Sequence, residues 1–142
     1  MLEDDGFVPV GRITLQLPSR FLVHFDRGDA QLWGPAIYAF RIAGEVVRIG
    51  KCESTLKDHM IMSQRLISRA LDGNFQKGGT NPWEAFEYRK RLTEHPDGEF
   101  LARRGPTDEK RALIRRYDPP LCNDSPCARS RPPEAVFGAR TG

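Results

Sequence analysis

Cysteine is scarce in this chain of 142 residues. The three cysteines are Cys52, Cys122 and Cys127, and no two of them form a Cys-x-x-Cys pair. This number and spacing fit neither a disulfide framework nor a standard zinc site, and they indicate free intracellular thiols. An apolar run long enough to cross a bilayer and a leader segment are also missing. We therefore expect no membrane partner and a cytoplasmic location.

A strong charge of either sign is missing too. The net charge is +3 and 39% of the residues are hydrophobic, which is typical of one globular domain and unlike a histone-like protein. Many of the basic side chains lie between Arg65 and Arg116. Because charged helix faces are often merely solvated, this basic half permits a nucleic-acid partner without proving one.

The segment 34–50 contains two short apolar runs separated by 43–45, and this pattern predicts a β-hairpin. Strand alternation places Tyr38 among small and aromatic side chains. The second strand ends at Gly50 and Lys51, where a backbone can approach a ligand and a cation can meet an anion. We expect function at this end of the hairpin.

Other patterns predict the elements around the hairpin. The alternating residues 13–17 and the apolar run 21–25 are expected to extend or cover the central sheet. The remaining predicted elements are helices over 55–72, 82–92 and 107–117 and a short strand over 99–103. Ser54 is the expected N-cap of the first helix. The acidic residues 1–6 are expected to be loose.

The first predicted helix has two arginines on its exposed face. Arg65 and Arg69 are four residues apart, and Arg65 lies opposite the apolar Leu56. Their mutual repulsion would be relieved by a polyanionic partner. Plain solvation of both side chains is the alternative interpretation.

Glu109 lies at the start of the third predicted helix, four residues before Leu113. Its carboxylate therefore points in the direction of the apolar side. A half-buried carboxylate needs a partner, and a divalent cation is a suitable one. The alternative is a first-turn glutamate that interacts favourably with the helix dipole.

Taken in order, these segments resemble the GIY-YIG nuclease domain family, in particular its homing and restriction members. Residues 36–38 stand in the place of GIY, and residues 48–50 stand in the place of YIG, with Arg48 replacing the second tyrosine. Glu109 and the segment that ends at Asn123 are similar to the metal-binding glutamate and the closing asparagine of the family. The match covers about 34–123.

The resemblance implies a role for each matched residue. Glu109 is expected to hold a single Mg²⁺ or Mn²⁺, and Tyr38 is expected to orient or deprotonate the attacking water. Arg65 or Arg69 would clamp the phosphate, and Asn123 would hold the site together. The implied catalytic set is Tyr38, Arg48, Lys51, Arg65, Arg69, Glu109 and Asn123. The implied nucleic-acid-binding set is Lys51, Arg65, Arg69, Lys77, Arg89 and Arg103.

The expected fold is α+β, with a small three-stranded, mainly antiparallel central sheet flanked by about three helices and with an extra N-terminal strand or strands. Three regions are expected along the chain. Residues 1–33 form an N-terminal extension that packs on the core, residues 34–123 form the nuclease-like domain, and residues 124–142 form a flexible tail.

The expected function is metal-dependent endonucleolytic hydrolysis of DNA, with RNA not excluded as a substrate. A homodimer or a recruiting partner would supply any site specificity that so small a domain lacks. The first alternative is a catalytically impaired nucleic-acid-binding module with the same fold, for which Arg48 is the best sign. A protein-interaction domain is the second alternative.

Overall fold

One antiparallel sheet of five strands, in the order β2-β1-β5-β3-β4, forms the centre of the protein. The computed structural model describes residues 1–122. The elements are η1 (Leu2–Asp5), β1 (Val8–Gln16), β2 (Arg20–Phe25), η2 (Gly28–Leu32), β3 (Ala36–Ile42), β4 (Glu45–Cys52), α1 (Leu56–Leu71), α2 (Pro82–Glu94), β5 (Gly98–Arg104) and α3 (Lys110–Tyr117). None of the helices in this part of the chain is long and apolar enough to cross a membrane.

The expected three-stranded sheet is wrong, although the α+β class is confirmed. β1 pairs with β2 on one side and with β5 on the other, so the N-terminal strands continue the sheet. The pairing of Val8 with Ala102 joins residues that are distant in the sequence. Such a pairing leaves no local pattern, because the alternation within a strand does not name its neighbour. The predicted tail and Asn123 lie outside the described residues.

The predicted hairpin is present as β3 and β4. Its turn has positive φ at both Ala43 (53°) and Gly44 (82°), which is the backbone that a tight two-residue hairpin turn requires. The register pairs Tyr38 with Gly50 and Phe40 with Arg48. Directly paired residues share a face of the sheet, so these four side-chain positions lie on one face.

Local capping explains where the helices begin. Thr55, and not Ser54, caps α1 by accepting a hydrogen bond at Oγ1 from the Asp58 N–H at 3.2 Å. Asn81 and Glu84 form a reciprocal capping box at the start of α2. The third helix is shorter than predicted, because the Lys110 N–H bonds the Thr107 carbonyl in a turn before the helix begins.

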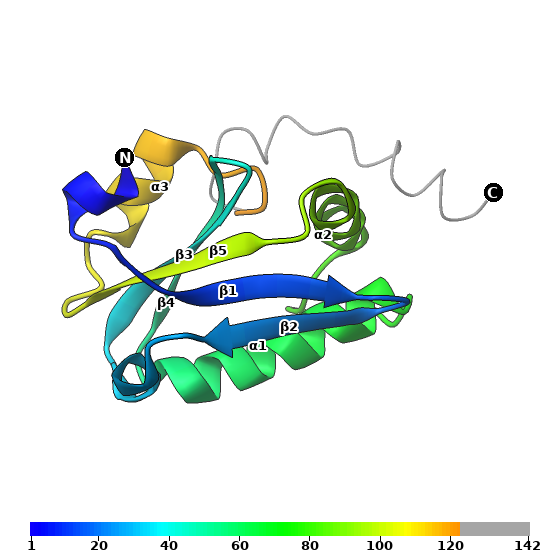
Figure 1. Cartoon of the computed structure of the whole chain (residues 1–142), viewed down its shortest axis with the longest axis horizontal. Helices are drawn as coiled ribbons and strands as arrows, with labels where there is room; N and C mark the ends of the chain where they lie inside the picture. Colours follow the sequence, from blue (N-terminus) through cyan, green and yellow to red (C-terminus); the bar gives the residue numbers. More distant parts are fainter. Residues whose placement is uncertain (123–142) are drawn as a thin grey trace.

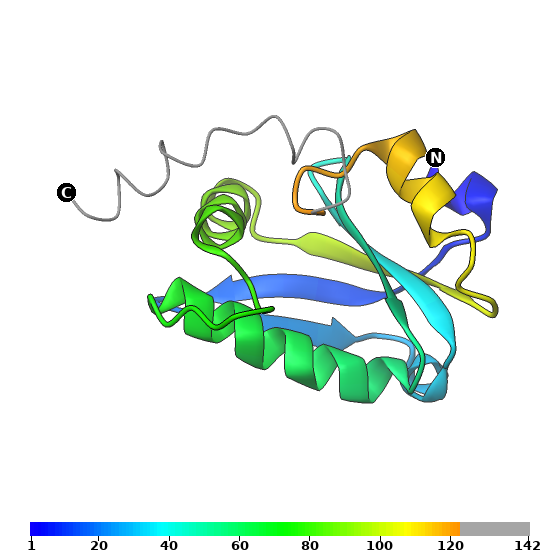
Figure 2. The same cartoon turned by 180° about the vertical axis from the view of Figure 1, so that it is seen from behind.

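Helices cover the two faces of the sheet separately. α1 and α2 pack on the face that carries Tyr38 and Phe40, and α3 packs on the face that carries Ile37 and Ala39. Figure 1 shows α3 beside the N-terminal helix, and Figure 2 shows α1 in front of β2 from the other side. We call these the α1 face and the α3 face.

Part of each edge of the sheet is covered by side chains or by another segment. Along β2, the N–H of Val23 donates to Gln64 Oε1 at 2.6 Å and the N–H of Phe21 donates to Ser68 Oγ at 3.0 Å, both from α1. Along β4, the Leu121 N–H donates to the Val47 carbonyl at 2.9 Å. Backbone groups that are bonded in this way are not available to pair with another chain. The same contacts fix α1 and the segment at Leu121 next to the strands.

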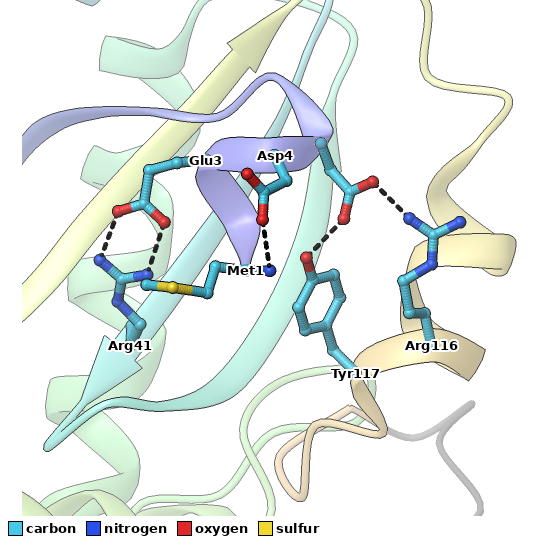
Figure 3. Close-up of polar contacts among 7 residues, drawn as sticks. Met1, Glu3, Asp4, Arg41, Arg116 and Tyr117 are labelled. Atoms are coloured by element: carbon cyan, nitrogen blue, oxygen red, sulfur yellow. Dashed lines mark hydrogen bonds and ion pairs between the residues drawn. The ribbon is translucent and has the colours of Figure 1, made fainter.

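The N-terminal residues are held firmly and are not loose. Arg41 is only 9% exposed, and its guanidinium donates to Glu99 Oε2 at 2.7 Å and to Glu3 Oε2 at 2.9 Å. Asp5 accepts hydrogen bonds from Tyr117 and Arg116 of α3. Figure 3 shows the bonds of this first turn with Arg41, Arg116 and Tyr117, through which it joins β3 to α3.

Because of this cluster, the stability of the fold depends on pH in the acid range. The hydrogen bond from Arg41 is the main cause that lowers the pKa of Glu3 from 4.5 to about 2. Because the folded-state pKa is the lower one, the stabilisation is present above about pH 4.5 and is lost as the pH falls toward 2. Thermal unfolding followed by circular dichroism should show a shallower loss over this range for Glu3→Gln than for the wild type. Equal slopes would contradict the assignment.

Candidate active site

The hydroxyl of Tyr38 lies at the centre of a polar cluster on the α1 face. Tyr38 is 1% exposed. Arg48 Nε donates to its Oη at 3.4 Å, and His59 Nε2 lies 3.3 Å from the same oxygen. The phenol of Tyr38 on β3 therefore contacts both Arg48 on β4 and His59 in the first turn of α1.

Gly50 makes room for this phenol. A Cβ at Gly50 would lie 2.5 Å from both Cζ and Oη of Tyr38, which is closer than carbon and oxygen atoms can approach. The register that pairs these two residues thus requires glycine at position 50. The sequence suggested a close backbone approach here, and the approaching group is the side chain of Tyr38.

Arg48 links Tyr38 to two other segments. Its Nη1 donates to the carbonyl of Leu121 at 3.1 Å and lies 3.7 Å from Glu84 Oε2. The electrostatic attraction of Tyr38 is the main cause that raises the pKa of Arg48, so the guanidinium stays charged at every physiological pH. The guanidinium thus contacts the phenol of Tyr38 through Nε and the carboxylate of Glu84 through Nη1.

His59 supplies a neutral imidazole. Burial is the main cause that lowers its pKa, and the nearby charge of Arg48 lowers it further. The usual value is about 6.5, so the ring is neutral at pH 7 and has a nitrogen available to accept a proton. The contact with Tyr38 Oη gives the proton a path from the phenol to the imidazole.

Glu84 is the buried carboxylate of this cluster. It is 5% exposed, and its Oε1 accepts from the Asn81 N–H at 3.4 Å in the capping box of α2. Oε2 is the oxygen that faces Arg48. A carboxylate with so little exposure is retained only where partners compensate for its lost hydration. Here Arg48 and the N-terminus of α2 are such partners.

A pocket of about 120 Å³ adjoins this cluster. Arg48, Glu84 and Tyr88 line one part of it. The other lining residues come from α1 and the loop before α2: Ser63, Leu66, Ile67, Gly78, Gly79 and Thr80. The polar side chains among the lining residues include a guanidinium, a carboxylate and two aliphatic hydroxyls. This combination suits a hydrated, anionic ligand.

Three residues of the predicted site lie on the α3 face. Arg103 and Lys51 both pair with Ile37 in neighbouring strands. Paired residues share a face, so both lie with Ile37 on the face opposite Tyr38. Glu109 has a side chain that is 62% exposed, and its Oε2 lies 3.0 Å from Arg103 Nη2. The structure therefore does not bring Glu109 or Lys51 to Tyr38.

The predicted nucleic-acid-binding residues divide into two groups. Arg65, Arg69 and Lys77 are exposed. In contrast, Arg89 is bound internally, since its Nη1 donates to the Pro18 carbonyl at 2.7 Å and its Nη2 donates to the Leu71 carbonyl at 2.6 Å. Arg103 likewise donates to the carbonyl of Asp5 at 3.2 Å and pairs with Glu109, as described above.

Three residues of the cluster were missed in the sequence. Neither His59 nor Tyr88 belongs to a motif that indicates a site. Glu84 belongs to the pattern Asn-x-x-Glu, which predicts the start of a helix. The pattern does not predict that the carboxylate also lines a pocket. The spacing of Glu84 and Tyr88 by four residues does place both on one side of α2.

Comparison with solved structures finds two proteins of similar fold. The restriction endonuclease HPY188I in complex with product DNA matches with a TM-score of 0.53 and 10% identity, over 92% of this chain and 84% of that chain. A mutant of bacteriophage T4 EndoII matches with a TM-score of 0.54 and 19% identity, over 85% and 96%. No protein-family model and no curated protein matches the sequence. The chain therefore has a fold that is also found in nucleases.

Proposed function

We propose that this protein is a divalent-metal-dependent endonuclease that hydrolyses DNA phosphodiester bonds by a GIY-YIG-type mechanism. The observation that carries the proposal is the convergence of Tyr38, Arg48, His59 and Glu84 on the α1 face. This set provides a phenol, a fixed cation, a neutral base and a carboxylate within one polar corner. The fold shared with the restriction endonuclease HPY188I supports DNA as the substrate.

Glu84 fits the role of the metal ligand better than Glu109. Mg²⁺ prefers oxygen ligands, keeps several waters, and is often held by one carboxylate together with substrate phosphates. Glu84 is buried in the same pocket as the hydroxyls of Ser63 and Thr80, whereas the carboxylate of Glu109 is mostly exposed on the α3 face. In the described residues 1–122, His, Cys, Asp and Glu form no cluster of three, so a single-carboxylate site is the one that fits.

The chemistry requires a nucleophilic water, charge stabilisation and a proton acceptor. A metal on Glu84 would supply Lewis-acid polarisation of the phosphate. Arg48 would donate to a non-bridging phosphate oxygen. The proton lost by the attacking water would pass to Tyr38 Oη, while the phenol proton moves to His59 Nε2. The water oxygen forms the new bond to phosphorus, and the bond to the leaving oxygen breaks. The leaving alkoxide would be stabilised by the metal charge and would take its proton from solvent water.

One observation favours the second candidate, a nucleic-acid-binding module without catalysis. Arg48 replaces the second tyrosine and lies 3.7 Å from Glu84 Oε2, where its charge competes with a metal ion. This candidate predicts salt-dependent DNA binding that is independent of metal and is accompanied by no strand cleavage.

The direct test is plasmid nicking by the purified chain in Mg²⁺, in Mn²⁺ and in EDTA. We expect conversion of supercoiled to nicked plasmid with either metal and none with EDTA. Tyr38→Phe keeps the ring packing and removes the hydroxyl, so it should abolish nicking without unfolding the protein. Failure of the folded wild type to cut with any divalent metal would favour the binding module.

DNA binding should depend on the exposed arginines of α1, Arg65 and Arg69. The double variant Arg65→Ala and Arg69→Ala should weaken binding and reduce the slope of log K against log salt by about 1 to 2 units, since each phosphate contact contributes about 0.9. Fluorescence anisotropy in Ca²⁺ measures this slope. Arg89→Ala is the matched control, because it removes internal carbonyl contacts and should lower the Tm but keep the slope. If Arg89→Ala reduced the slope and the double variant did not, the α1 surface would be excluded as the DNA-binding surface.

A further inference from the structure

Two large apolar side chains are exposed on the outer face of α1. Met62 is 59% exposed and Ile61 is 45% exposed. Single exposed apolar residues are ordinary, but the outer face of a helix normally carries polar side chains, and these two residues are adjacent. At about 100° per residue they point to different sides of the helix. Their neighbours therefore decide what each of them can contact.

Met62 borders the pocket. Residues three and four positions apart are neighbours on a helix surface. His59 of the polar cluster lies three residues before Met62, and Leu66, which lines the pocket, lies four residues after it. Ile61 instead neighbours Gln64, which bonds the backbone of β2. Met62 thus lies on the pocket side of α1, and Ile61 lies on the β2 side.

Charged side chains flank Met62 along the helix. Arg65 and Arg69 follow it by three and seven residues, and both are exposed on the same stripe. Asp58, in the first turn, is the one acidic residue of the helix. An anionic strand that contacts the two arginines and enters the pocket would pass directly over Met62. Charge and position therefore favour DNA as the partner that covers this side chain.

The reacting groups of the site lie below the surface of the protein. Tyr38 is 1% exposed and Glu84 is 5% exposed. A straight duplex laid along α1 would therefore keep its phosphates outside the site. The DNA backbone must deform to reach these groups, and the cost of deformation depends on how well the bases are stacked at that point.

We propose that Met62 is an apolar wedge that inserts at a base step and kinks the DNA beside the scissile phosphate. This inference rests on the proposed function and names the substrate class preferred by that site, which is DNA with a weakly stacked or damaged step. Methionine is among the side chains that proteins insert between bases, and its unbranched thioether is flexible and polarisable. Because insertion costs stacking energy, a step that is already unstacked should be cut fastest.

Met62→Ala tests the proposal on two end-labelled duplexes, one fully paired and one with a single abasic site. The wild type should cut both, and faster beside the abasic site. The variant should cut the paired duplex about 10- to 100-fold more slowly, because nothing then holds the step open. Beside the abasic site, which needs no wedge, its rate should be within about threefold of the wild type. A general loss of folding or affinity would slow both cuts equally.

Ile61→Ala is the matched control, because it shortens an exposed apolar side chain on the β2 side of the same helix. It should leave both rates unchanged, and neither variant should lower the Tm. A readout besides cleavage uses Ca²⁺ and a duplex with a fluorescent adenine analogue that brightens when it is unstacked. Binding of the wild type and of Ile61→Ala should brighten the analogue, and binding of Met62→Ala should not.

The outcomes separate this inference from the proposed function. Equal cleavage of the paired duplex by the wild type and Met62→Ala overturns the role of Met62 alone, and so does an equal slowing on both duplexes. A wild type that binds DNA without brightening the analogue overturns it as well. Loss of self-association in Met62→Ala, measured by sedimentation and without a change in fluorescence, would assign the side chain to an interface between copies. A folded wild type that cleaves no DNA overturns the proposed function, and the fluorescence then still decides whether Met62 unstacks bases.

Discussion

Glu84→Gln should reduce DNA cleavage by about 100-fold or more, whereas Glu109→Gln should leave it unchanged. Glutamine at position 84 keeps an oxygen acceptor for the capping box and loses the negative charge that holds a metal. Stability should fall too, by up to about 3 kcal/mol, because the charge of Arg48 loses a buried partner, so cleavage is measured well below the Tm of the variant. Single-turnover cleavage in Mg²⁺, with thermal unfolding measured in parallel, gives both results.

Glu109→Gln is a demanding comparison, because Glu109 matched the family pattern in the sequence and Glu84 did not. It removes an exposed ion pair with Arg103, which contributes about 0 to 1 kcal/mol to stability. Loss of cleavage in this variant, with Glu84→Gln active, would place the chemistry on the α3 face and contradict the site described above.

Gly50→Ala should have the second largest effect, through Tyr38. The new methyl group would occupy a point 2.5 Å from the phenol oxygen, so the ring must move away from Arg48 and His59. Overpacking of this kind typically costs about 1 to 3 kcal/mol in stability. A displacement of about 1 Å at a reacting group can lower a rate about 100-fold. Cleavage assays and denaturant unfolding of the same variant measure the two effects.

Gly28→Ala provides the matched control for this substitution. A Cβ at Gly28 meets no atom within 4 Å, and its φ lies outside the left-handed region. The alanine there should leave cleavage unchanged and stability unchanged or slightly higher. A Gly50→Ala variant that unfolds more easily but cuts DNA at the wild-type rate would show that the position of Tyr38 is not critical.

Local signals in the sequence were sufficient for the elements near Tyr38. The turn at Ala43 and Gly44 separates two apolar runs, so the hairpin was predicted with nearly its observed bounds. Pro82 after Asn81 gave the start of α2. These features depend on neighbours in the chain, and short-range patterns describe them well.

Features that depend on long-range pairing could not be predicted in this way. β1 lies between β2 and β5 because Val8–Gln16 pairs with residues about ninety positions later, and no local pattern encodes that choice. The contacts of the buried Arg41 with Glu3 and Glu99 also join residues that are far apart in the sequence, so no local pattern predicts them. An acidic N-terminal segment therefore looked loose in the sequence although it is anchored in the structure.

The site residues illustrate the same limit. Tyr38 and Arg48 were found because they stand in the places of the two motif tyrosines, within one predicted hairpin. The helical position of Glu109 was read as facing the apolar side, but Glu109 is the N-cap residue of α3. Its side chain is mostly exposed and pairs with Arg103, a contact that spacing within the helix does not reveal. His59, Glu84 and Tyr88 belong to helices whose packing against the sheet decides what they contact.

The measurement that tests the central claim most directly is a crystal structure with DNA and Mn²⁺, in which anomalous scattering locates the metal. The account predicts one Mn²⁺ on the α1 face, bound to a Glu84 oxygen at about 2.2 Å, with the scissile phosphate between it and Arg48. A metal bound at Glu109 on the α3 face, or DNA bound far from Tyr38, would contradict the account.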